Sequence, residues 1–338
     1  MRQSVLRSIL FFILLGALSV GVAAQSEPKV GFLKRLDNKL AKHYFTSKYD
    51  SDYVARPHQR WLLRLMVNQT GDYIHAKGTI KDVWSKYDLH TKHKTTLSLE
   101  VNYCDLAISY SINPAKLKGN YDDYEFNFEY HAQKFSVDIN YQRATSLKGD
   151  LKLGNFTHLD EDGILMKVFN VAGYYVFNNR KFSYPAALYQ NYYQLRSAGS
   201  WLAGASYQGG SVKTTEELKE RSPQAPEVRL RFTNIGIGGG YGYNFVFGKH
   251  AQWLLHLSAM PTFVVYKHNK LTVNDEEISD DRTSLNMIFN ERASLVYHFS
   301  PRSFVGASFI MSNSVFDDTN VVIRQNKWML RTFVGLRL

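Results

Sequence analysis

Cysteine and long hydrophobic runs are nearly absent from this sequence of 338 residues. The only cysteine, Cys104, has no partner for a disulfide and excludes a metal site built on a Cys-x-x-Cys pair, so we expect an ordinary strand or turn residue there. After residue 24, no run approaches the roughly 18 apolar residues of a membrane-spanning helix. These absences exclude a disulfide-stabilised domain and a helical membrane protein.

Motifs that would carry catalysis or bind a cofactor are also lacking. The sequence holds no strained glycine–serine elbow and no local serine–histidine pairing. His90 and His93 lie in a polar stretch without further metal ligands. The other notable histidines, His131, His256 and His298, are expected to be lumenal or interfacial. We therefore predict no catalytic, cofactor-binding or metal-binding residue.

Acidic residues are outnumbered, with 30 aspartates and glutamates against 41 lysines and arginines and a formal net charge of +11. A basic surplus suits nucleic acid, anionic lipid or an anion-attracting lumen. The cations are spread along the whole chain, whereas nucleic-acid-binding proteins cluster them. We therefore expect no nucleic acid among the partners.

The first 58 residues form two segments that precede the main domain. Residues 1–24 have the charged start, apolar core and small cleavage-site residues of a secretory signal peptide, which predicts export. Residues 25–58 contain a basic amphipathic stretch, Lys29–Lys48, that is expected to be helical, and then a turn-rich linker with Pro57. The expected helix either lies on anionic lipid headgroups or is simply solvated beside the main domain.

Strict period-two alternation organises the rest of the chain, most clearly over Tyr121–Gln142. Apolar and polar residues alternate in two runs with a short break between them, which indicates two strands with one apolar face each. Such a pair predicts an antiparallel hairpin. A tight turn at Ala132–Gln133 would set Asn127 opposite Asp138, with both polar faces on the same side.

The same alternation recurs in about twelve segments, and their connections alternate in length. Long polar loops are expected to begin near Asn68, Asn113, Thr145, Gly209, Lys267 and Phe316. Tight turns are expected near Cys104, Ala132, Gly248 and Pro301. This pattern is typical of bacterial outer-membrane barrels. We predict an all-β fold over residues 59–338, a transmembrane antiparallel β-barrel of about 12 strands, with a short N-terminal periplasmic helix and both termini periplasmic.

Closure of such a barrel would pair the last strand, Trp328–Leu338, with the first, so that no sheet edge remains. The charged side chains expected to line the lumen are Arg64, Glu100, Glu125, Glu129, Asp138, Arg331 and Arg337. The arginines come from the first and last strands, and the carboxylates come from strands between these two. We therefore expect a basic wall and an acidic wall. The terminal strand, residues 328–338, is also the expected contact with the barrel-assembly machinery.

A second stripe expected in the lumen consists of four glycines: Gly236, Gly238, Gly240 and Gly242. Glycine inside a strand marks a bend or a close approach of another group. Residues 178–200 are rich in aromatic side chains, lack clean alternation and are expected to form a plug or a constriction. Two explanations stay open: rings of Phe182–Tyr193 fill a groove over the glycines, or glycine merely permits strong curvature of the wall.

Three stretches carry a family resemblance: YDSDYVARP (residues 49–57), NYCDLAISYSIN (102–113) and SYPAALYQNYYQLRSAGS (183–200). Together with the leader, they resemble a Bacteroidetes family of exported proteins known as domain of unknown function 4421. The resemblance implies an outer-membrane barrel and supplies no activity or site residue. The terminal Leu338 departs from the aromatic residue that usually ends such a strand.

Three functions remain open on the sequence alone. The protein is a structural or binding barrel with a filled lumen, a narrow pore for small polar solutes, or a membrane-embedded hydrolase of lipid or peptide. About twelve strands leave a narrow lumen, and the aromatic segment offers a filling for it. The expected location is the outer membrane, with its lipids as partners and no cofactor.

Overall fold

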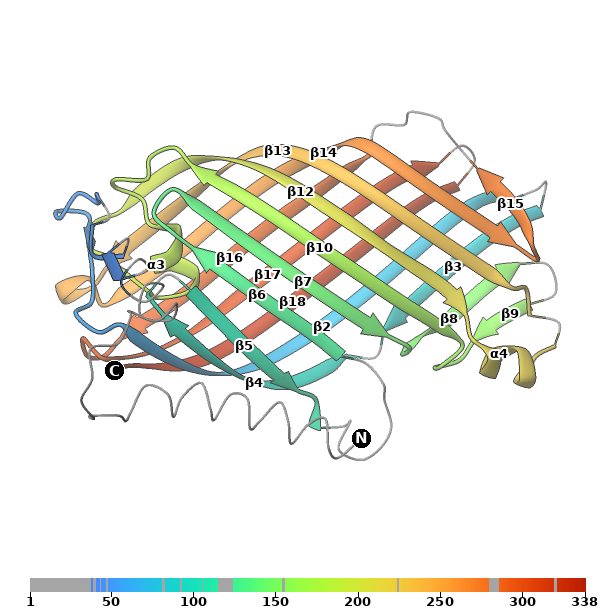
Figure 1. The fold of residues 1–338 in the computed structure, drawn as a ribbon, viewed down its shortest axis with the longest axis horizontal. Coiled ribbons are helices and arrows are strands. Elements are labelled where there is room, and N and C mark those ends of the chain that lie inside the picture. The colour runs from blue at the N-terminus through green and yellow to red at the C-terminus, as the bar shows by residue number, and fades with distance from the viewer. Residues whose placement is uncertain are drawn as a thin grey trace, which may run out of the picture. The chain divides into compact units, whose positions relative to one another are not determined.

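The segments in which polar and apolar residues alternate form long strands, and these strands curl into a closed barrel (Figure 1). The computed structural model describes residues 38, 41–42, 44–46, 48–80, 83–91, 93–104, 106–114, 124–153, 156–223, 225–279, 286–318 and 321–338. The expected signal peptide lies outside these residues. Of the expected helix over Lys29–Lys48, the described residues Asn38, Ala41, Lys42, Tyr44 and Phe45 are helical.

The chain divides into two units, Met1–Lys42 and His43–Leu338, and the barrel belongs to the second. Its strands are β1 (Val54–Ala55), β2 (Trp61–Ile80), β3 (Val83–Thr91), β4 (Lys94–Tyr103), β5 (Leu106–Ile112), β6 (Tyr124–His131), β7 (Phe135–Ala144), β8 (Leu147–Leu153), β9 (Phe156–Leu159), β10 (Ile164–Val176), β11 (Tyr193–Gln194), β12 (Ala198–Thr214), β13 (Val228–Phe247), β14 (Trp253–Val273), β15 (Glu276–Ser279), β16 (Met287–His298), β17 (Ser303–Asp318) and β18 (Val321–Arg337). Two short helices, α3 (Tyr184–Leu188) and α4 (Glu216–Arg221), and a 3-10 turn, Lys249–Ala251, complete the described structure. Among the described residues, no helix is long and apolar enough to cross a membrane.

The wall is a ring of antiparallel strands in the order β2, β4, β5, β6, β7, β10, β12, β13, β14, β16, β17, β18. The ring closes because β18 pairs with β2 along its whole length, from Val321 opposite Gly78 to Arg337 opposite Leu62. Each strand of this described ring therefore has a hydrogen-bonded neighbour on both sides. The predicted antiparallel barrel of about 12 strands is confirmed.

The register of the β6–β7 hairpin differs from the predicted one by two residues. Asn127 lies opposite Asn140, and Asp138 lies opposite Glu129. The reason is the connection, which runs through residues 132–134 where the sequence predicts a two-residue turn. A shift of two keeps every side chain on its face, so the two polar faces still coincide.

Five of the predicted long loops are wrong, because the chain there continues as regular structure. Near Phe316, β17 continues to Asp318, which pairs with Val321 of β18. The stretches 68–94, 145–162, 209–228 and 267–282 contain the outer parts of β2, β12 and β14 together with β3, β8, β9, α4 and β15. Leu89, Leu147, Leu159 and Leu218 are buried together among these elements. The extensions therefore have a small core of their own, which explains why polar segments are ordered as strands.

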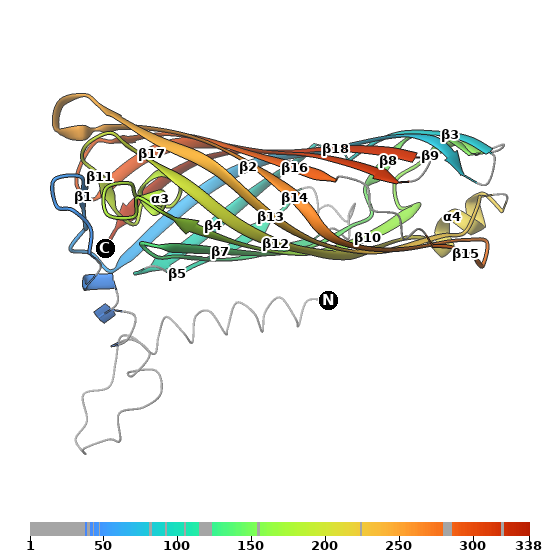
Figure 2. The ribbon, with the colours of Figure 1, turned by 90° about the horizontal axis from the view of Figure 1, so that it is seen from above.

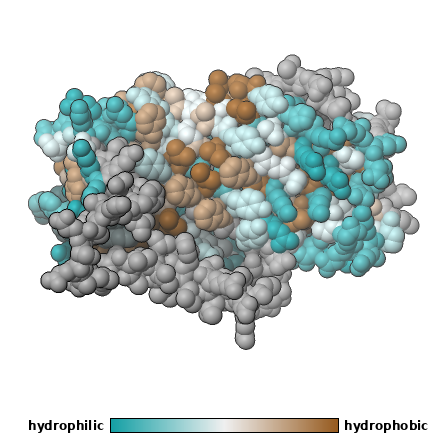
Figure 3. Space-filling view, viewed as in Figure 1, coloured by the Kyte–Doolittle hydropathy of each residue, from teal (hydrophilic) through white to brown (hydrophobic). Residues whose placement is uncertain are grey.

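The two ends of the barrel differ in character. The C-terminus and tight connections, such as those between β4 and β5 and between β16 and β17, gather at one end, the terminus end, and the extensions at the other, the distal end (Figures 1 and 2). On the face seen in Figure 3, apolar residues cover the middle of the barrel and polar residues cover the distal end. The main core lies inside the terminus end, around the connection from β10 to β12.

Candidate functional site

The connection from β10 to β12, residues 177–197, enters the terminus end of the barrel (Figures 1 and 2). We call it the lumenal segment. All residues from 182 to 192 are buried. Its helix α3 begins because Ser183 accepts a hydrogen bond from the Ala186 N–H at 3.1 Å and Pro185 favours the first turn. The short strand β11 then pairs with β1, so the N-terminal linker holds the segment from outside.

Two buried arginines of the wall bind carbonyl groups of the lumenal segment. Arg64 on β2 donates to the Leu188 carbonyl and to the Gln190 side chain, both at 2.9 Å. Arg337 on β18 donates to the Gln190 carbonyl at 2.9 Å and to the Tyr193 hydroxyl at 2.8 Å. Hydrogen bonds from a charged donor are stronger than neutral ones. The closing pair of strands therefore fastens the end of α3.

Two neutral side chains bind the segment from the opposite strands. Ser294 on β16 donates to the Ala187 carbonyl at 2.6 Å. Asn244 on β13 donates to the Ser183 carbonyl at 3.0 Å. These four wall groups, on β2, β13, β16 and β18, are buried. The segment is therefore held around its circumference by groups that have no access to bulk water.

The charge of Arg64 is balanced by a carboxylate on the neighbouring strand. Arg64 and Glu100 occupy opposite positions of β2 and β4, and the Arg64 Nε donates to Glu100 at 2.7 Å. Both side chains are at most 1% exposed, and a buried charge needs such a partner. The prediction of separate basic and acidic walls is therefore wrong at this position of the barrel, because the charges of Arg64 and Glu100 form one ion pair on neighbouring strands. Arg331 donates to Asn68 at 3.0 Å instead of facing a carboxylate.

Two further contacts cross the lumen on the distal side of the segment. Arg292 on β16 pairs with Asp138 on β7 at 3.2 Å, and Lys327 on β18 donates to Gln142 on β7 at 2.9 Å. Strand β7 is not a neighbour of β16 or β18 in the ring, so these side chains bridge the interior. Glu125 and Glu129 share β6, but their side chains lie outside the described part of the structure.

A serine, a histidine and an asparagine form a hydrogen-bonded relay beside the lumenal segment. His256 Nδ1 lies 2.7 Å from Asn244 Oδ1, and His256 Nε2 lies 3.0 Å from Ser258 Oγ. The Asn244 amide nitrogen faces the Ser183 carbonyl and the Gln194 Oε1, which leaves its oxygen to accept from Nδ1–H. The neutral ring then presents Nε2 as the acceptor for the Ser258 hydroxyl.

That order is the nucleophile–base–orienter order of acyl-transfer sites. Asn244 and His256 are fully buried, and the rings of Phe182 and Tyr184 lie 6.0 Å and 5.5 Å from the His256 ring. The lumenal segment therefore covers the relay. The relay was not found from the sequence, because Asn244 and His256 meet only through the register of β13 and β14, where they lie opposite each other.

The four glycines of the stripe have different neighbours. A Cβ on Gly242 would lie 3.2 Å from the Phe182 ring of the lumenal segment. A Cβ on Gly238 or Gly240 would instead lie 2.5 Å or 2.1 Å from a backbone carbonyl of β14, and one on Gly236 would meet Thr262 at 2.7 Å. Close packing against β14 therefore explains most of the stripe, and a ring of the segment explains only one position.

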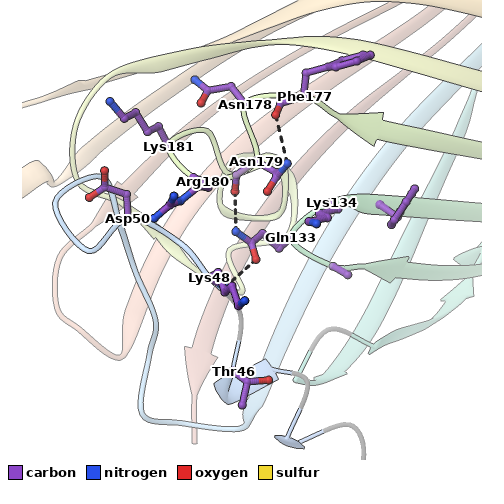
Figure 4. A pocket seen from close by; sticks show the side chains of 12 residues that line it. Thr46, Lys48, Asp50, Gln133, Lys134, Phe177, Asn178, Asn179, Arg180 and Lys181 are labelled. Carbon is purple, nitrogen blue, oxygen red and sulfur yellow. Dashed lines mark hydrogen bonds between the residues drawn. The ribbon is translucent and has the colours of Figure 1, made fainter.

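A cavity of about 890 Å³ opens at the terminus end, between the linker, the β6–β7 turn and the start of the lumenal segment (Figure 4). Its charged lining residues are Lys48, Asp50, Lys134, Arg180 and Lys181. Gln133 holds the parts together, since it accepts from the Lys48 N–H at 2.8 Å and donates to the Asn179 carbonyl at 3.0 Å. With four cations and one carboxylate, the cavity attracts anions.

Sequence reasoning found two of the four wall groups that hold the segment, Arg64 and Arg337, as charged residues of strand faces. It missed Ser294 and Asn244, which are short polar side chains of ordinary appearance. Arg292 is a third residue that sequence reasoning missed. It lies on the polar face of its strand, and the residues that follow it on the other face are apolar. This alternation could have identified it as a lumenal residue. No cluster of metal ligands is present in the part of the chain that the structure describes.

A closed antiparallel ring with a polar, filled interior and an apolar exterior defines the fold of an outer-membrane β-barrel. The chain belongs to the family described as Domain of unknown function (DUF4421), which matches residues 48–337. No curated protein matches the sequence.

Three solved structures illustrate the likeness in fold. The outer membrane protease OmpT from Escherichia coli has a TM-score of 0.38 and 8% identity, over 87% of this chain and 100% of that one. The translocator domain of the autotransporter NalP from Neisseria meningitidis has a TM-score of 0.33 and 7% identity, over 90% and 96%. The outer membrane protein OprG from Pseudomonas aeruginosa has a TM-score of 0.31 and 10% identity, over 84% and 98%.

Proposed function

We propose that the protein is an outer-membrane barrel whose lumen is closed by residues 177–197, and that it serves as a binding or structural barrel. The observation that carries this proposal is the set of buried wall groups bound to carbonyls of that segment. Withdrawal of the segment would cost all of these hydrogen bonds, and those from the two arginines are of the stronger, charge-assisted kind. A stable closed state is the expected consequence.

The outer surface supports a place in a membrane. Outward side chains at mid-barrel are large and apolar, such as Leu65, Phe126 and Ile237, which are 50%, 51% and 54% exposed. A soluble protein seldom exposes a continuous band of this kind, whereas a transmembrane barrel requires one. Short connections lie on the periplasmic side in bacterial barrels. The proposed orientation therefore puts the terminus end in the periplasm and the extensions outside.

The test is ion conductance of the refolded mature chain in planar bilayers, beside a variant that lacks residues 182–193. We expect no steady current from the unmodified protein and current from the deletion variant. A steady current from the unmodified protein would overturn the proposal in favour of a narrow pore for small polar solutes. Silence from both would place closure at the cross-lumen contacts of Arg292 and Lys327.

A second candidate function, hydrolysis of lipid or peptide acyl groups, has one specific observation in its favour, the Ser258–His256–Asn244 relay. Burial of His256 and Asn244 counts against it, because a substrate carbonyl must reach the serine. A fluorophosphonate probe, which reacts covalently with activated serines, discriminates the two. We expect no modification of Ser258 in the intact protein, and stoichiometric modification would favour the hydrolase.

A further inference from the structure

Outward side chains of five neighbouring strands form rows across the barrel wall, because opposite residues of antiparallel strands share a face. One such row runs through β7, β10, β12, β13 and β14 and consists of Arg143, Lys167, Ser211, Arg231 and Lys270. Four of these five positions are cationic. The row includes two directly opposed like-charged pairs, Arg143 with Lys167 and Arg231 with Lys270.

This cation row lies at the distal edge of the apolar band. The next row towards the terminus end contains Tyr141, Phe169 and Gly209, and the row after that contains Tyr207 and Ile235. Along β10 and just beyond it, the stretch from Lys167 to Phe177 has the length of roughly 9–11 residues that a tilted strand needs to cross a bilayer. On the face seen in Figure 3, the apolar surface gives way to the polar distal surface. The row is therefore placed at the level of lipid headgroups.

A groove of about 360 Å³ opens on this face, lined by Tyr141, Lys167, Phe169, Tyr207, Gly209 and Arg231 among others. Gly209 keeps it open, since a Cβ there would lie 2.7 Å from the Tyr207 hydroxyl. The rings of Phe169 and Tyr207 stand 6.3 Å apart on its apolar side. The groove thus has aromatic walls towards the membrane and cations towards its polar rim.

The charges of the row are incompletely neutralised within the described part of the chain. Lys270 pairs with Glu277, but Lys167 and Arg231 have no carboxylate partner there. Like charges directly opposite each other in a sheet are destabilising. An anion between Lys167 and Arg231 would relieve this repulsion, and Ser211, which lies between them, adds a hydroxyl donor.

We propose that this groove binds the phosphate-bearing headgroup of a lipid in the leaflet at the distal end. The phosphate lies between Lys167, Ser211 and Arg231, since lysine and arginine are the usual partners of phosphate oxygens. The acyl chains lie along Phe169 and Tyr207. This site depends on the proposed position in a membrane but not on closure of the lumen, because the groove is on the outer face.

The experiment is native mass spectrometry of the full mature chain in detergent, titrated with phosphatidic acid and with phosphatidylcholine of the same chain length. We expect bound phosphatidic acid in preference to phosphatidylcholine. The double variant Lys167→Gln, Arg231→Gln should bind phosphatidic acid roughly 10- to 30-fold more weakly, because each cation near a lipid surface contributes about a factor of five. Equal binding by the unmodified and double-variant proteins would overturn the proposal.

The matched control is Lys77→Gln, Arg324→Gln, which removes one exposed lysine and one exposed arginine from β2 and β18 on another part of the wall. We expect binding within twofold of the unmodified protein. An equal loss in this control would show that only total charge matters and would overturn the site.

A third variant, Gly209→Leu, fills the groove and keeps every cation. It should lose the preference for phosphatidic acid if the headgroup occupies the groove, and full retention would overturn that part of the proposal. An acidic protein partner would instead leave all lipid titrations unchanged. These titrations measure lipid binding in detergent, and the conductance test measures whether the lumen is closed. A negative result in one therefore leaves the outcome of the other unchanged.

Discussion

At the scale of single residues, the interior is organised by two arginines that serve both the wall and the lumenal segment. Arg64 has its charge balanced by Glu100 and still donates to Leu188. Arg337 has no carboxylate partner among its described contacts and relies on the Gln190 and Pro301 carbonyls and the Tyr193 hydroxyl. Arginine suits both tasks, because its planar fork offers five donors. Lysine at either position would satisfy fewer acceptors.

Replacement of Arg64 by alanine should destabilise the folded barrel by about 3–5 kcal/mol, the usual cost of leaving one partner of a buried ion pair alone. The measurement is the urea midpoint of unfolding in lipid vesicles. Arg324→Ala is the matched control, since Arg324 is exposed, and its effect should stay within about 0.5 kcal/mol. The double change Arg64→Met, Glu100→Leu should recover part of the loss, because neither charge is then buried without a partner. No recovery would mean that the contacts to Leu188 and Gln190 dominate.

Adjacent glycines of β13 give a second prediction at this scale. Gly238→Ala should destabilise the barrel by about 1–3 kcal/mol, because its Cβ would lie 2.5 Å from the Pro261 carbonyl and 2.9 Å from the Thr262 Cα. Gly239→Ala has only the Leu202 carbonyl at 3.6 Å and should be neutral or stabilise by about 0.4–1 kcal/mol through the unfolded chain. Urea unfolding of the two variants measures the difference. Equal effects would contradict the explanation of the stripe by close strand packing.

At the scale of elements, the strands of the wall followed from the sequence, whereas their lengths and the additional strands of the distal end did not. Alternation over Tyr124–His131 and Phe135–Gln142 is strict, and both strands form as predicted. Beyond the apolar band, at residues 72–80 of β2, Ile74, Ala76 and Ile80 share the strand face of Asp72 and the other face is polar. The apolar face is thus the reverse of that in the membrane-spanning part, and the sequence prediction did not follow this change of face. The ladder continues there because β3 supplies hydrogen-bond partners, which are invisible in the sequence. The buried leucines of the extensions come from segments far apart in the chain.

Helix α4 of the distal end is tied to the residue before β13, Glu227, by a pair whose strength depends on pH. The Lys219 ammonium donates to Glu227 at 2.7 Å, and this hydrogen bond holds the pKa of Glu227 below its ordinary value of 4.5. A lowered pKa in the folded state means that the pair stabilises above about pH 4.5 and that this contribution is lost as the pH falls through the lowered value. Both side chains are about one-third exposed, so the effect is local and small.

Hydrogen exchange of residues 215–228, corrected for the intrinsic dependence on pH, should therefore show protection at pH 6 that decreases towards pH 3. The variant Lys219→Met lacks the pair, so at pH 6 and at pH 3 it should show the low protection that the unmodified protein has at pH 3. A parallel decrease in this variant would assign the effect to another group of the distal end.

At the scale of the whole molecule, topology followed from the sequence more reliably than the contents of the lumen. The alternation of short and long connections fixes which strands are neighbours and that both ends of the barrel domain meet at one end. The lumenal segment was recognisable by its lack of alternation, but its partners were not. Ser294 and Arg292 come from β16, which is not a neighbour of β10 or β12 in the ring, and Asn244 is one of many polar residues on its strand. A linear pattern carries no information about contacts across the interior.

Closure itself depends on the last strand, which forms ladders with both β17 and β2. Removal of residues 328–338 would open two edges in the membrane-facing half of the wall, and unpaired backbone groups are very costly in hydrocarbon. It would also remove Arg331 and Arg337, and with the latter two hydrogen bonds to the Gln190 carbonyl. We expect this truncation to abolish the protease-resistant barrel after refolding into vesicles.

Deletion of residues 276–279 is the matched control, since β15 pairs only with the distal part of β14 among the described strands, and the resistant barrel should persist. If the truncated chain still gave the resistant form, the wall could close through β17 and β2, and the proposed contact of the terminal strand with the assembly machinery would lose its structural basis.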